Sequence, residues 1–490
     1  MTCYDLAVIG GGPAGVAGAL TAAQAGLRVA LLDGGARLGG QYFRHPPASL
    51  QASDPGAFHH GLDRFLRQGA ALADRADLLL GHQVWTVERV ASGAAEAAPF
   101  RVHALRDDRP VVVAARRLLV ATGAHDRPLP FPGWDLPGVL TAGGAQALLK
   151  GNLVVAGRRV VVSGTGPFLL PVAAGLASAG ARVLGVYEAN GGLGLARHPL
   201  LALGKAGEAA GYGLALARRR VPYRTRQAVV AAHGGDELTH VTVAELDRDW
   251  HVRATRTVEC DTLAVGYGFT PQLELLTQLG CDTAHDLDGS PVVTVDAAQR
   301  TSVPGVWAAG EPTGVGGAVL AEVEGRIAGL AIARSRGGNA PAPSPGAGVG
   351  GAGLGRGAGV LVRRRARLRG FARALLEAYP VRDGWRSWLA DDTLVCRCEE
   401  VPLSAVREAR ELGATDARSV KLLSRAGMGW CQGRMCGYAV ACLAGEQPQQ
   451  PRRPIAQPIT LGALQKSAPP DFPDPSALKH DERISDDKSR

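Results

Sequence analysis

Two close pairs of cysteines near the end of the chain are the residues best suited to chemistry. The stretch LVCRCEEVP contains Cys396 and Cys398, and GWCQGRMCG contains Cys431 and Cys436, so half of the eight cysteines in 490 residues lie in two short segments. Four thiolates can bind a [2Fe-2S] cluster, two to each iron. Structural zinc sites usually leave at least two residues between paired ligands, and a C-x-C pair is short for that geometry. The spacing therefore favours a [2Fe-2S] cluster, with zinc or unliganded thiols as the alternatives.

A glycine motif of the form G-x-G-x-x-G opens the chain and predicts a dinucleotide site. Gly10 allows a tight turn after an apolar strand, Gly12 lets the backbone approach a pyrophosphate, and Gly15 lets the following helix pack on the strand. Amides at the helix N-terminus then face the phosphates. Asp33 ends the next strand, where its carboxylate can accept hydrogen bonds from ribose hydroxyls. The candidate contacts in this βαβ unit are Gly10, Gly12, Pro13, Ala14, Gly15 and Asp33.

A second unit, RRVVVSGTGPFLLPVAAGLASAGARVLGVYEA, repeats this pattern with one departure. Gly164 and Gly166 stand in the turn, but Leu169 occupies the third glycine position. Glu188 ends the second strand, and an acid there suits NAD rather than NADP because it disfavours a 2′-phosphate. The unit predicts either a working nucleotide site or a retained fold whose pocket is empty or altered.

Two further stretches indicate how these elements are connected. A buried strand leads into Thr122 and Gly123, and a later strand ends at Gly310 and Glu311 before a glycine-rich turn and a helix. Both resemble chain returning to the first nucleotide domain. We therefore expect an α/β fold with two Rossmann-like dinucleotide-binding domains, the second inserted in the first, followed by a small helical [2Fe-2S] domain. The predicted boundaries are 1–155 and 266–336 for the first domain, 156–265 for the second, 337–359 for a flexible Gly- and Pro-rich linker, 360–446 for the helical segment and [2Fe-2S]-binding domain, and 447–490 for a Pro-rich and charged tail.

The chain is basic, with 54 Lys and Arg against 45 Asp and Glu. Nucleic acid is not the expected partner, because no groove-entering motif accompanies this charge. The densest basic run, residues 363–373, is interpreted as a solvated helix face, with a docking face for a protein partner as the alternative. No apolar run reaches the roughly 18 residues that a membrane span needs. The N-terminus enters a strand at once, so we expect no signal peptide and a cytoplasmic location.

No general base or substrate pocket can be assigned from the sequence. His45, His125 and His198 are candidates only because histidines can transfer protons, and a surface or structural role is the favoured interpretation of each. The remaining cysteines are interpreted as plain buried residues (Cys3, Cys260, Cys281 and Cys442).

Residues 1 to about 335 resemble the flavoproteins with two dinucleotide domains. The resemblance implies that the first glycine motif and Asp33 hold the ADP part of FAD, and that the segment Ala121–Gly123 borders the FAD. It also implies that the acid of the late G-D motif binds the ribityl chain. This sequence has Gly310 and Glu311 there, which keeps the carboxylate on a longer side chain. A disulfide reductase activity is not expected, because no cysteine in this part of the chain belongs to a redox C-x-x-C or C-x4-C pair.

A closer resemblance spans nearly the whole chain. The motifs LGGQYFR, GVGGAVLAEVEGRIAG, LVCRCEEV, SRAGMGWCQGRMCG and RRPIAQPITLGAL are similar to those of the A, or α, subunits of bacterial opine oxidases, hydrogen cyanide synthase and dye-linked amino acid dehydrogenases. The cysteine segment resembles the [2Fe-2S] domain of bacterioferritin-associated ferredoxin. Further candidate FAD contacts are Gly40, Gln41 and Val84.

This resemblance implies FAD and a [2Fe-2S] cluster as cofactors, with NAD or another nucleotide as the candidate for the second domain. It also implies a heteromer in which a flavoprotein β subunit oxidises a C–N bond and this chain accepts the electrons, passing them to a downstream acceptor. The alternative is a self-contained NADH-dependent reductase, which would feed its flavin and cluster through the second nucleotide domain.

Overall fold

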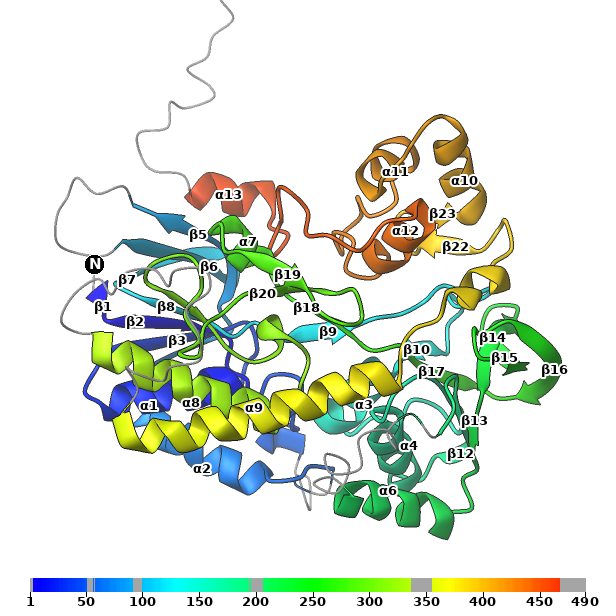
Figure 1. The fold of residues 1–490 in the computed structure, drawn as a ribbon, viewed down its shortest axis with the longest axis horizontal. Coiled ribbons are helices and arrows are strands. Elements are labelled where there is room, and N and C mark those ends of the chain that lie inside the picture. The colour runs from blue at the N-terminus through cyan, green and yellow to red at the C-terminus, as the bar shows by residue number, and fades with distance from the viewer. Residues whose placement is uncertain are drawn as a thin grey trace, which may run out of the picture.

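The first large element of the computed structural model is a five-stranded parallel sheet in the order β21-β8-β2-β3-β4 (Figure 1). The structure describes residues 3–50, 56, 58–90, 99–192, 194, 206–335 and 355–467. Apolar residues of the central strands are buried on both faces, as expected of a covered parallel sheet. The strands are β2 (Leu6–Ile9), β3 (Val29–Asp33), β4 (Asp77–Leu80), β8 (Leu118–Val120) and β21 (Val306–Ala308).

Two helices, α1 (Pro13–Gln24) and α8 (Ala318–Arg334), pack tightly against each other beside this sheet. A Cβ on Gly325 would lie 2.0 Å from the carbonyl oxygen of Ala14, so only glycine permits this contact. Other elements of the first domain are β1 (Cys3–Tyr4), β5 (Gln83–Arg89), β6 (Phe100–Arg106) and β7 (Arg109–Ala115), which form a four-stranded sheet, the helices α2 (Leu62–Ala73) and α7 (Glu274–Gln278), and the short η1 (Ala48–Leu50) and η3 (Glu311–Thr313).

A second five-stranded parallel sheet, in the order β10-β17-β11-β12-β13, lies between the two parts of the first domain in the sequence. This confirms the predicted insertion of one Rossmann-like domain in the other. Strand β10 pairs with β17 and so belongs to the second sheet, although it precedes the predicted boundary at residue 156. The strands are β10 (Val139–Thr141), β11 (Arg159–Gly164), β12 (Arg182–Glu188), β13 (Tyr223–Thr225) and β17 (Thr262–Gly266), with helices α3 (Ala142–Asn152), α4 (Leu169–Ser178) and α6 (Ala206–Arg218).

Smaller sheets complete the second domain and join the two domains. An antiparallel sheet of β14 (Gln227–Gly234), β15 (Leu238–Leu246) and β16 (Val252–Glu259) lies beside the second parallel sheet. Where the chain passes between the two domains, β9 (Ala124–Asp126) pairs with β18 (Phe269–Pro271). A separate two-stranded sheet consists of β19 (Thr283–His285) and β20 (Pro291–Val293).

The cysteine segment folds into a small helical domain, shown in orange in Figure 1. Its helices end where glycine or a capping residue permits: Gly413 follows α10 at φ +101°, and Asp416 caps α11 through a reciprocal hydrogen-bond pair with Ser419. The elements are η5 (Asp383–Trp388), β22 (Leu394–Cys396), β23 (Val401–Pro402), α10 (Leu403–Glu411), α11 (Ala417–Ser424) and α12 (Gly437–Ala444). The helix α13 (Leu461–Ser467) follows this domain and packs against β7 of the first domain.

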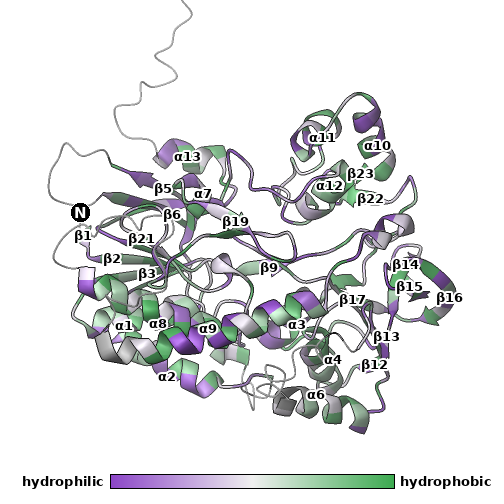
Figure 2. Cartoon of the chain, viewed as in Figure 1, coloured by the Kyte–Doolittle hydropathy of each residue, from purple (hydrophilic) through white to green (hydrophobic). Residues whose placement is uncertain are grey.

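The basic run lies on helix α9 (Gly355–Ala378), which packs along α8. Figure 2 shows hydrophilic and hydrophobic stretches alternating along this helix. Arg365 and Arg369 both form ion pairs with Glu324 of α8, whose side chain is fully buried, at 3.0 and 2.5 Å. The interpretation of the run as a solvated face is therefore wrong for these two arginines, because they neutralise a buried carboxylate within the same chain.

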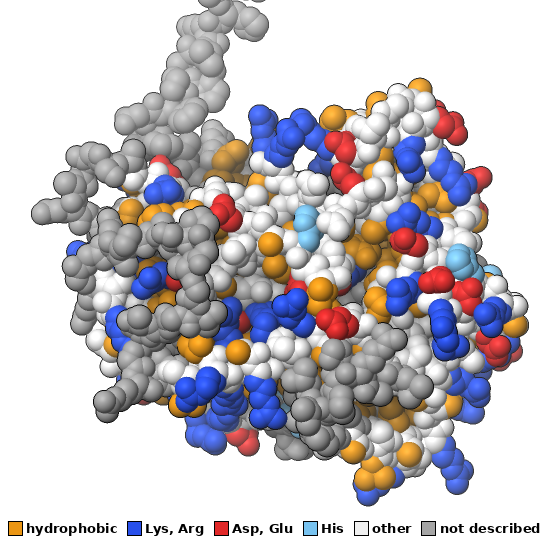
Figure 3. All heavy atoms as spheres, in the orientation of Figure 1, with side chains coloured by type: hydrophobic (Ala, Val, Ile, Leu, Met, Phe, Trp, Pro, Cys, Tyr) orange, Lys and Arg blue, Asp and Glu red, His pale blue; other side chains and the backbone are white. Residues whose placement is uncertain are grey.

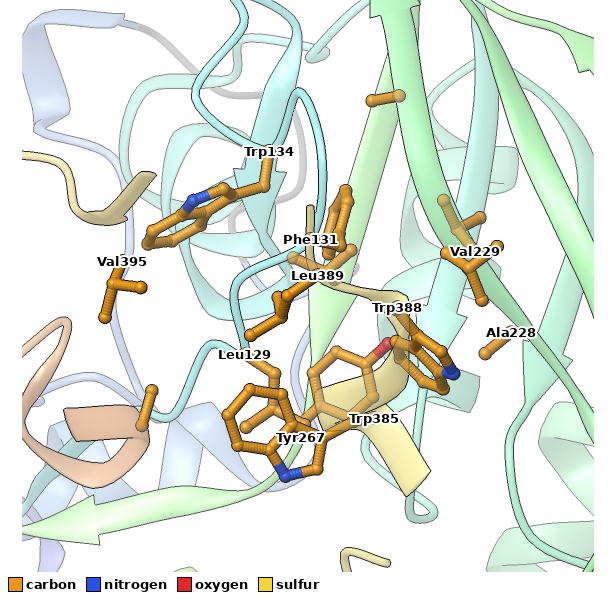
Figure 4. Close-up of a cluster of buried hydrophobic side chains, with 14 of the residues drawn as sticks. Leu129, Phe131, Trp134, Ala228, Val229, Tyr267, Trp385, Trp388, Leu389 and Val395 are labelled. Atoms are coloured by element: carbon orange, nitrogen blue, oxygen red, sulfur yellow. The ribbon is translucent and has the colours of Figure 1, made fainter. Parts of the chain in front are cut away.

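One hydrophobic core joins the second nucleotide domain to the cysteine domain. Figure 4 shows Val229 of β14 in one cluster of buried side chains with Trp385 and Trp388 of η5. Trp134 and Tyr267, from the chain just before and just after the second domain, belong to the same cluster. Within this core the Trp134 indole donates to the Leu394 carbonyl at 2.6 Å, and the Trp388 indole donates to the Trp250 carbonyl at 3.1 Å. The cysteine domain is therefore packed against the rest of the chain as well as linked to it.

The segment after the cysteine domain lies on the first nucleotide domain. The Gln278 side chain donates to the Pro454 carbonyl at 3.0 Å, and Ala456 is buried in the core under the first sheet. The predicted disorder of the last twenty residues concerns residues outside those that the structure describes, and so does most of the predicted linker.

Candidate functional site

The first glycine turn has the geometry that a pyrophosphate site needs. A Cβ on Gly10 would lie 2.3 Å from the Ala121 carbonyl oxygen, and one on Gly15 would lie 1.8 Å from the Gly10 carbonyl oxygen. A Cβ on Gly12 would meet only the Cα of Gly40, at 3.9 Å. Gly10 and Gly15 are thus required by packing within the protein, whereas the space beside Gly12, at the N-terminus of α1, is free for a ligand.

The carboxylate of Asp33 lies at this turn with part of its surface exposed. Its two oxygens accept hydrogen bonds from the amides of Gly11 at 2.5 Å and Gly35 at 2.6 Å. A carboxylate offers about four acceptor positions, so it can still accept from ribose hydroxyls. Pro13 is the first residue of α1 and Ala14 the second, as predicted. The residues present therefore fit the ADP part of a dinucleotide.

The loop after Asp33 lies against the glycine turn. The Gly39 amide donates to the Gly11 carbonyl at 2.9 Å. Gly40 has φ +58°, and a Cβ on it would lie 3.0 Å from the Cα of Gly12. The Gln41 side chain accepts a hydrogen bond from Arg44 at 2.8 Å. The predicted contact Val84 is a buried residue of β5. The side chain of the preceding residue, Gln83, lies beside Gly34, which directly follows β3.

Thr122 and Gly123 lie where β8 ends, and both are bound to one residue of the returning chain. The Thr122 hydroxyl donates to the Gln272 carbonyl at 2.7 Å, and the Gln272 amide donates to the Gly123 carbonyl at 3.0 Å. Gly310 has φ +81°, and its amide donates to Glu324 at 3.0 Å. The candidate residues of the first nucleotide domain are thus gathered at the carboxyl ends of its parallel strands, where ligands of such sheets bind.

Glu311 lies at this edge, but its carboxylate is engaged by the chain. Its oxygens accept from the amides of Gly316 at 2.8 Å and Gly317 at 3.0 Å, at the N-terminus of α8. Burial is the largest influence on this side chain and raises the pKa of Glu311. The carboxylate therefore holds the glycine turn before α8 in the conformation described.

The second glycine turn keeps its shape without the third glycine. Gly164 has φ +142° and lies so close to Gly266 that a Cβ would come within 1.8 Å of its carbonyl oxygen. Gly166 has φ +99° and borders open space. Leu169 begins α4 and is buried in the core of this domain.

Glu188 differs sharply from its counterpart Asp33, because its side chain is fully buried. It accepts hydrogen bonds from the Thr165 hydroxyl at 2.8 Å, the Gly166 amide at 2.8 Å and the Asn190 amide at 2.9 Å. Burial raises the pKa of Glu188 to about 7, against these hydrogen bonds, which lower it. A carboxylate so placed is satisfied by the protein and hidden from a ribose.

The end of α9 and the residues after it cover this carboxylate. The Asn190 side chain donates to the Pro380 carbonyl at 2.9 Å and to the Thr165 hydroxyl at 2.7 Å. A Cβ on Gly194 would come within 2.6 Å of the Ala378 carbonyl oxygen. The nearby Glu188 charge also raises the pKa of Tyr379, after the larger effect of burial. Residues 378–380 of the chain thus lie at the strand end where a nucleotide would bind.

The fold brings the four predicted cluster ligands together as two pairs of thiols. The sulfurs of Cys398 and Cys431 are 3.2 Å apart, and Cys436 is hydrogen-bonded to Cys396. That hydrogen bond, with the Gly427 amide 3.4 Å from the sulfur, lowers the pKa of Cys396 to about 5. Two pairs match a cluster of two irons with two thiolates each.

Glycines allow the cysteine loops to approach each other. A Cβ on Gly429 would lie 2.5 Å from the Cβ of Cys398, and Gly433 has φ +82°. Cys436 is the N-cap of α12. Among the described residues, no three His, Cys, Asp or Glu side chains gather around a single point as the ligands of one metal ion would. The pairwise arrangement of the cysteines fits a [2Fe-2S] cluster, which takes two thiolates on each iron.

The candidate histidines are in different places. The His45 ring lies 2.8 Å from the Phe43 carbonyl oxygen, which makes it a local structural residue. His198 lies outside the described residues. The His125 ring lies 2.9 Å from the carbonyl oxygen of Arg434, between two cluster cysteines. Of the other cysteines, Cys260 and Cys281 are buried as expected, whereas Cys3 and Cys442 are partly exposed.

Comparison with known proteins agrees with this geometry. Residues 4–325 match the model of the pyridine nucleotide-disulphide oxidoreductase family, and residues 394–444 match that of the BFD-like [2Fe-2S] binding domain. The chain belongs to the pyridine nucleotide-disulphide oxidoreductase family. These two matches assign FAD and a [2Fe-2S] cluster as cofactors, as predicted.

The similarity to several known proteins extends over almost the whole chain. The HcnB subunit of hydrogen cyanide synthase from Pseudomonas aeruginosa is 36% identical over 483 residues, covering 94% of this chain and 97% of HcnB. The A-type subunit of opine oxidase from Agrobacterium tumefaciens is 32% identical over 450 residues, covering 89% and 84%. The crystal structure of L-proline dehydrogenase from P. horikoshii has the same fold, with a TM-score of 0.65, 21% identity and coverage of 94% of this chain and 79% of that one.

Several residues that shape the site were not found from the sequence. Glu324 and its two arginines, the Arg434 contacts and the cover over Glu188 all join residues far apart in the chain. The one signal for Glu324 in the sequence is an acid within the helix predicted after the glycine-rich turn.

The charged side chains on the face shown in Figure 3 are mixed in sign. Lys and Arg side chains are scattered there, with Asp and Glu among them. None of the described helices has the length and apolar character that crossing a bilayer requires.

Proposed function

We propose that this chain is the FAD- and [2Fe-2S]-containing electron-transfer subunit of a heteromeric dehydrogenase acting on the CH–NH or CH–NH2 group of an amino acid or opine. A separate flavoprotein β subunit would oxidise the substrate and deliver its electrons to this chain, in the cytoplasm. Three kinds of relative support the proposal by name: HcnB of hydrogen cyanide synthase, the A-type subunit of opine oxidase and the alpha subunit of sarcosine oxidase. The last of these matches 56% of this chain at 30% identity.

The observation that carries the proposal is the direct contact between β9, which follows the candidate FAD contacts Thr122 and Gly123, and the loop of residues 431–436, here called the cluster loop. His125 lies two residues after Gly123 and contacts the backbone of the loop between Cys431 and Cys436. FAD, when bound, exchanges two electrons with a donor and can release them singly, and a [2Fe-2S] cluster carries one. A chain that keeps both groups near each other suits a conduit between a two-electron donor and a one-electron acceptor.

The alternative, a self-contained NADH-dependent reductase, needs a working second nucleotide site. The second site argues against it, because Glu188 is fully buried and already accepts three hydrogen bonds. Opening the site for a ribose would require residues 378–380 to leave the strand end, which would also expose the Asn190 contact with Pro380. We therefore expect the electrons to come from another polypeptide.

An anaerobic reduction experiment tests the proposal. The purified holoprotein is mixed with NADH, and in parallel with its co-purified flavoprotein partner and a panel of amino acids and opines. We expect the flavin and cluster absorbance to bleach only with the partner and one class of amine substrate. Dithionite, which reduces both groups directly, is the positive control. Rapid bleaching by NADH alone would refute the proposal and support the self-contained reductase.

A further inference from the structure

The strand that follows the FAD-bordering residues is bound to the cluster loop at one point. In β9, the Nε2 atom of His125 lies 2.9 Å from the carbonyl oxygen of Arg434. A carbonyl oxygen only accepts hydrogen bonds, so Nε2 carries the hydrogen and donates it. Burial, the largest influence, lowers the pKa of His125 to about 4, so the ring is a neutral donor at pH 7. The contact therefore adds no positive charge beside the cysteines.

A second connection reaches the same loop from the returning chain. The Arg434 side chain forms an ion pair with Glu274 at 2.9 Å and donates to the Ala456 carbonyl at 2.6 Å. Glu274 begins α7, two residues after Gln272, which is the residue hydrogen-bonded to Thr122 and Gly123. The FAD-bordering segment and the cluster loop are thus joined twice, once through His125 and once through Glu274, in a closed ring of contacts.

Alternate residues of this extended segment serve different neighbours, as the two-residue period of a strand requires. Arg127 is 2% exposed, lies 4.4 Å above the ring of Tyr438 in α12, and pairs with Asp288. The intervening Asp126 is hydrogen-bonded instead to the N-terminus of α3, where a Cβ on Gly143 would lie 2.5 Å from its carboxylate. His125 and Arg127, on one side of the segment, therefore both contact the cluster domain.

We infer that His125 is a positioning residue that fixes the cluster loop relative to β9 and the candidate FAD contacts Thr122 and Gly123, and so sets the rate of electron transfer between the two groups. The inference rests on the proposed electron-transfer function and deepens it. Among the described contacts, His125 meets the backbone of Arg434 and no cysteine, so its role is to hold the loop rather than to take part in a bond-making step. Among the described contacts, the path from Gly123 to the cluster loop through His125 passes through fewer residues than the path through Gln272 and Glu274.

The test compares His125→Leu, which removes the donor, with His125→Gln, whose side-chain amide can donate from nearly the same position. In the holoprotein, electron equilibration is followed after a sub-stoichiometric pulse of photoreductant, by the delay between flavin and cluster absorbance. Hydrogen exchange of the backbone amides of residues 431–437 is the second measurement. For His125→Leu we expect transfer to slow about fivefold or more and exchange to rise about tenfold, the population effect of losing one buried hydrogen bond. His125→Gln should restore both to within about twofold.

A matched control removes a hydrogen bond to the other cysteine segment. Trp134→Phe deletes the 2.6 Å bond to the Leu394 carbonyl but leaves the loop after Cys431 untouched, so transfer should stay at the wild-type rate. Equal slowing in Trp134→Phe would show general loosening and overturn the inference. A His125→Leu protein that holds FAD and iron and keeps the wild-type rate and exchange would also overturn it.

Two further outcomes keep the inference separate from the proposed function. If His125→Leu fails to retain iron, His125→Asn, whose shorter amide does not reach the Arg434 carbonyl, replaces it in the same comparison. Electron equilibration within this chain is measured without the partner flavoprotein. A wild-type chain that passes electrons to its cluster but is never reduced by an amine-oxidising partner would refute the proposed function alone.

Discussion

Replacing Gly12 by alanine separates ligand binding from folding at the first nucleotide site. Gly12 has φ −78° and ψ −175°, which any residue adopts, and its Cβ would meet only Gly40 at 3.9 Å. The cost to the apoprotein is thus about 1 kcal/mol or less, the usual scale for a helix N-cap change. A methyl group there blocks a pyrophosphate and removes at least one hydrogen bond to a charged group, which corresponds to roughly 1.5–3 kcal/mol, or about 10- to 150-fold in FAD affinity.

The assay measures FAD content and affinity together with the thermal stability of the apoprotein. Gly370→Ala, in α9 with no atom within 4 Å of its Cβ, is the control and should bind FAD normally. Gly10→Ala, with φ +110° and a 2.3 Å approach to Ala121, should instead fail to fold stably. Wild-type FAD affinity in Gly12→Ala would refute the assignment of this turn as the pyrophosphate site.

Three other changes test the rest of the molecule. Cys431→Ser should abolish the iron–sulfur absorbance and leave FAD bound, and loss of both cofactors would contradict this. Relative to Glu188→Gln, the wild type should lose about 2–3 kcal/mol of unfolding free energy between pH 5 and pH 8. Burial raises the pKa of Glu188 to about 7, so ionising this carboxyl as the pH rises destabilises the native state. Denaturant titrations at both pH values measure the difference between the two proteins, and a difference that does not change with pH would contradict the prediction. Arg369→Leu should lower the unfolding free energy by about 3 kcal/mol by leaving buried Glu324 with one cation, whereas Arg367→Leu on the exposed side of the same helix should have little effect.

The local motifs of this protein could be predicted because each depends on residues close together in the chain. The strand, glycine turn, helix and acid from Leu6 to Asp33 form one βαβ unit, so their spacing alone predicted the fold of that unit. The C-x-C and C-x4-C pairs likewise indicated a cluster, because ligand spacing reflects the bite of the metal group. The insertion of one domain in the other followed from two strands that ended in the same kind of glycine turn.

Other features could not be predicted because they join segments hundreds of residues apart. Asp33 and Glu188 hold equivalent places in their motifs, yet only the tertiary structure leaves the first partly exposed and covers the second with residues 378–380. A motif specifies which atoms are available, whereas the packing of distant chain decides which of them water or a ligand can reach.

The sequence by itself determined two Rossmann-like units and predicted four cluster ligands and their order along the chain. The tertiary structure decided that the second unit is closed, that α9 neutralises Glu324, and that His125 meets the backbone of Arg434. The physical reason is that backbone turns and ligand pairs are set by neighbours in the chain, while burial and hydrogen-bond partners are set by neighbours in space. For this protein, neighbours in the chain therefore predict the two cofactor sites, while neighbours in space decide which contacts connect them.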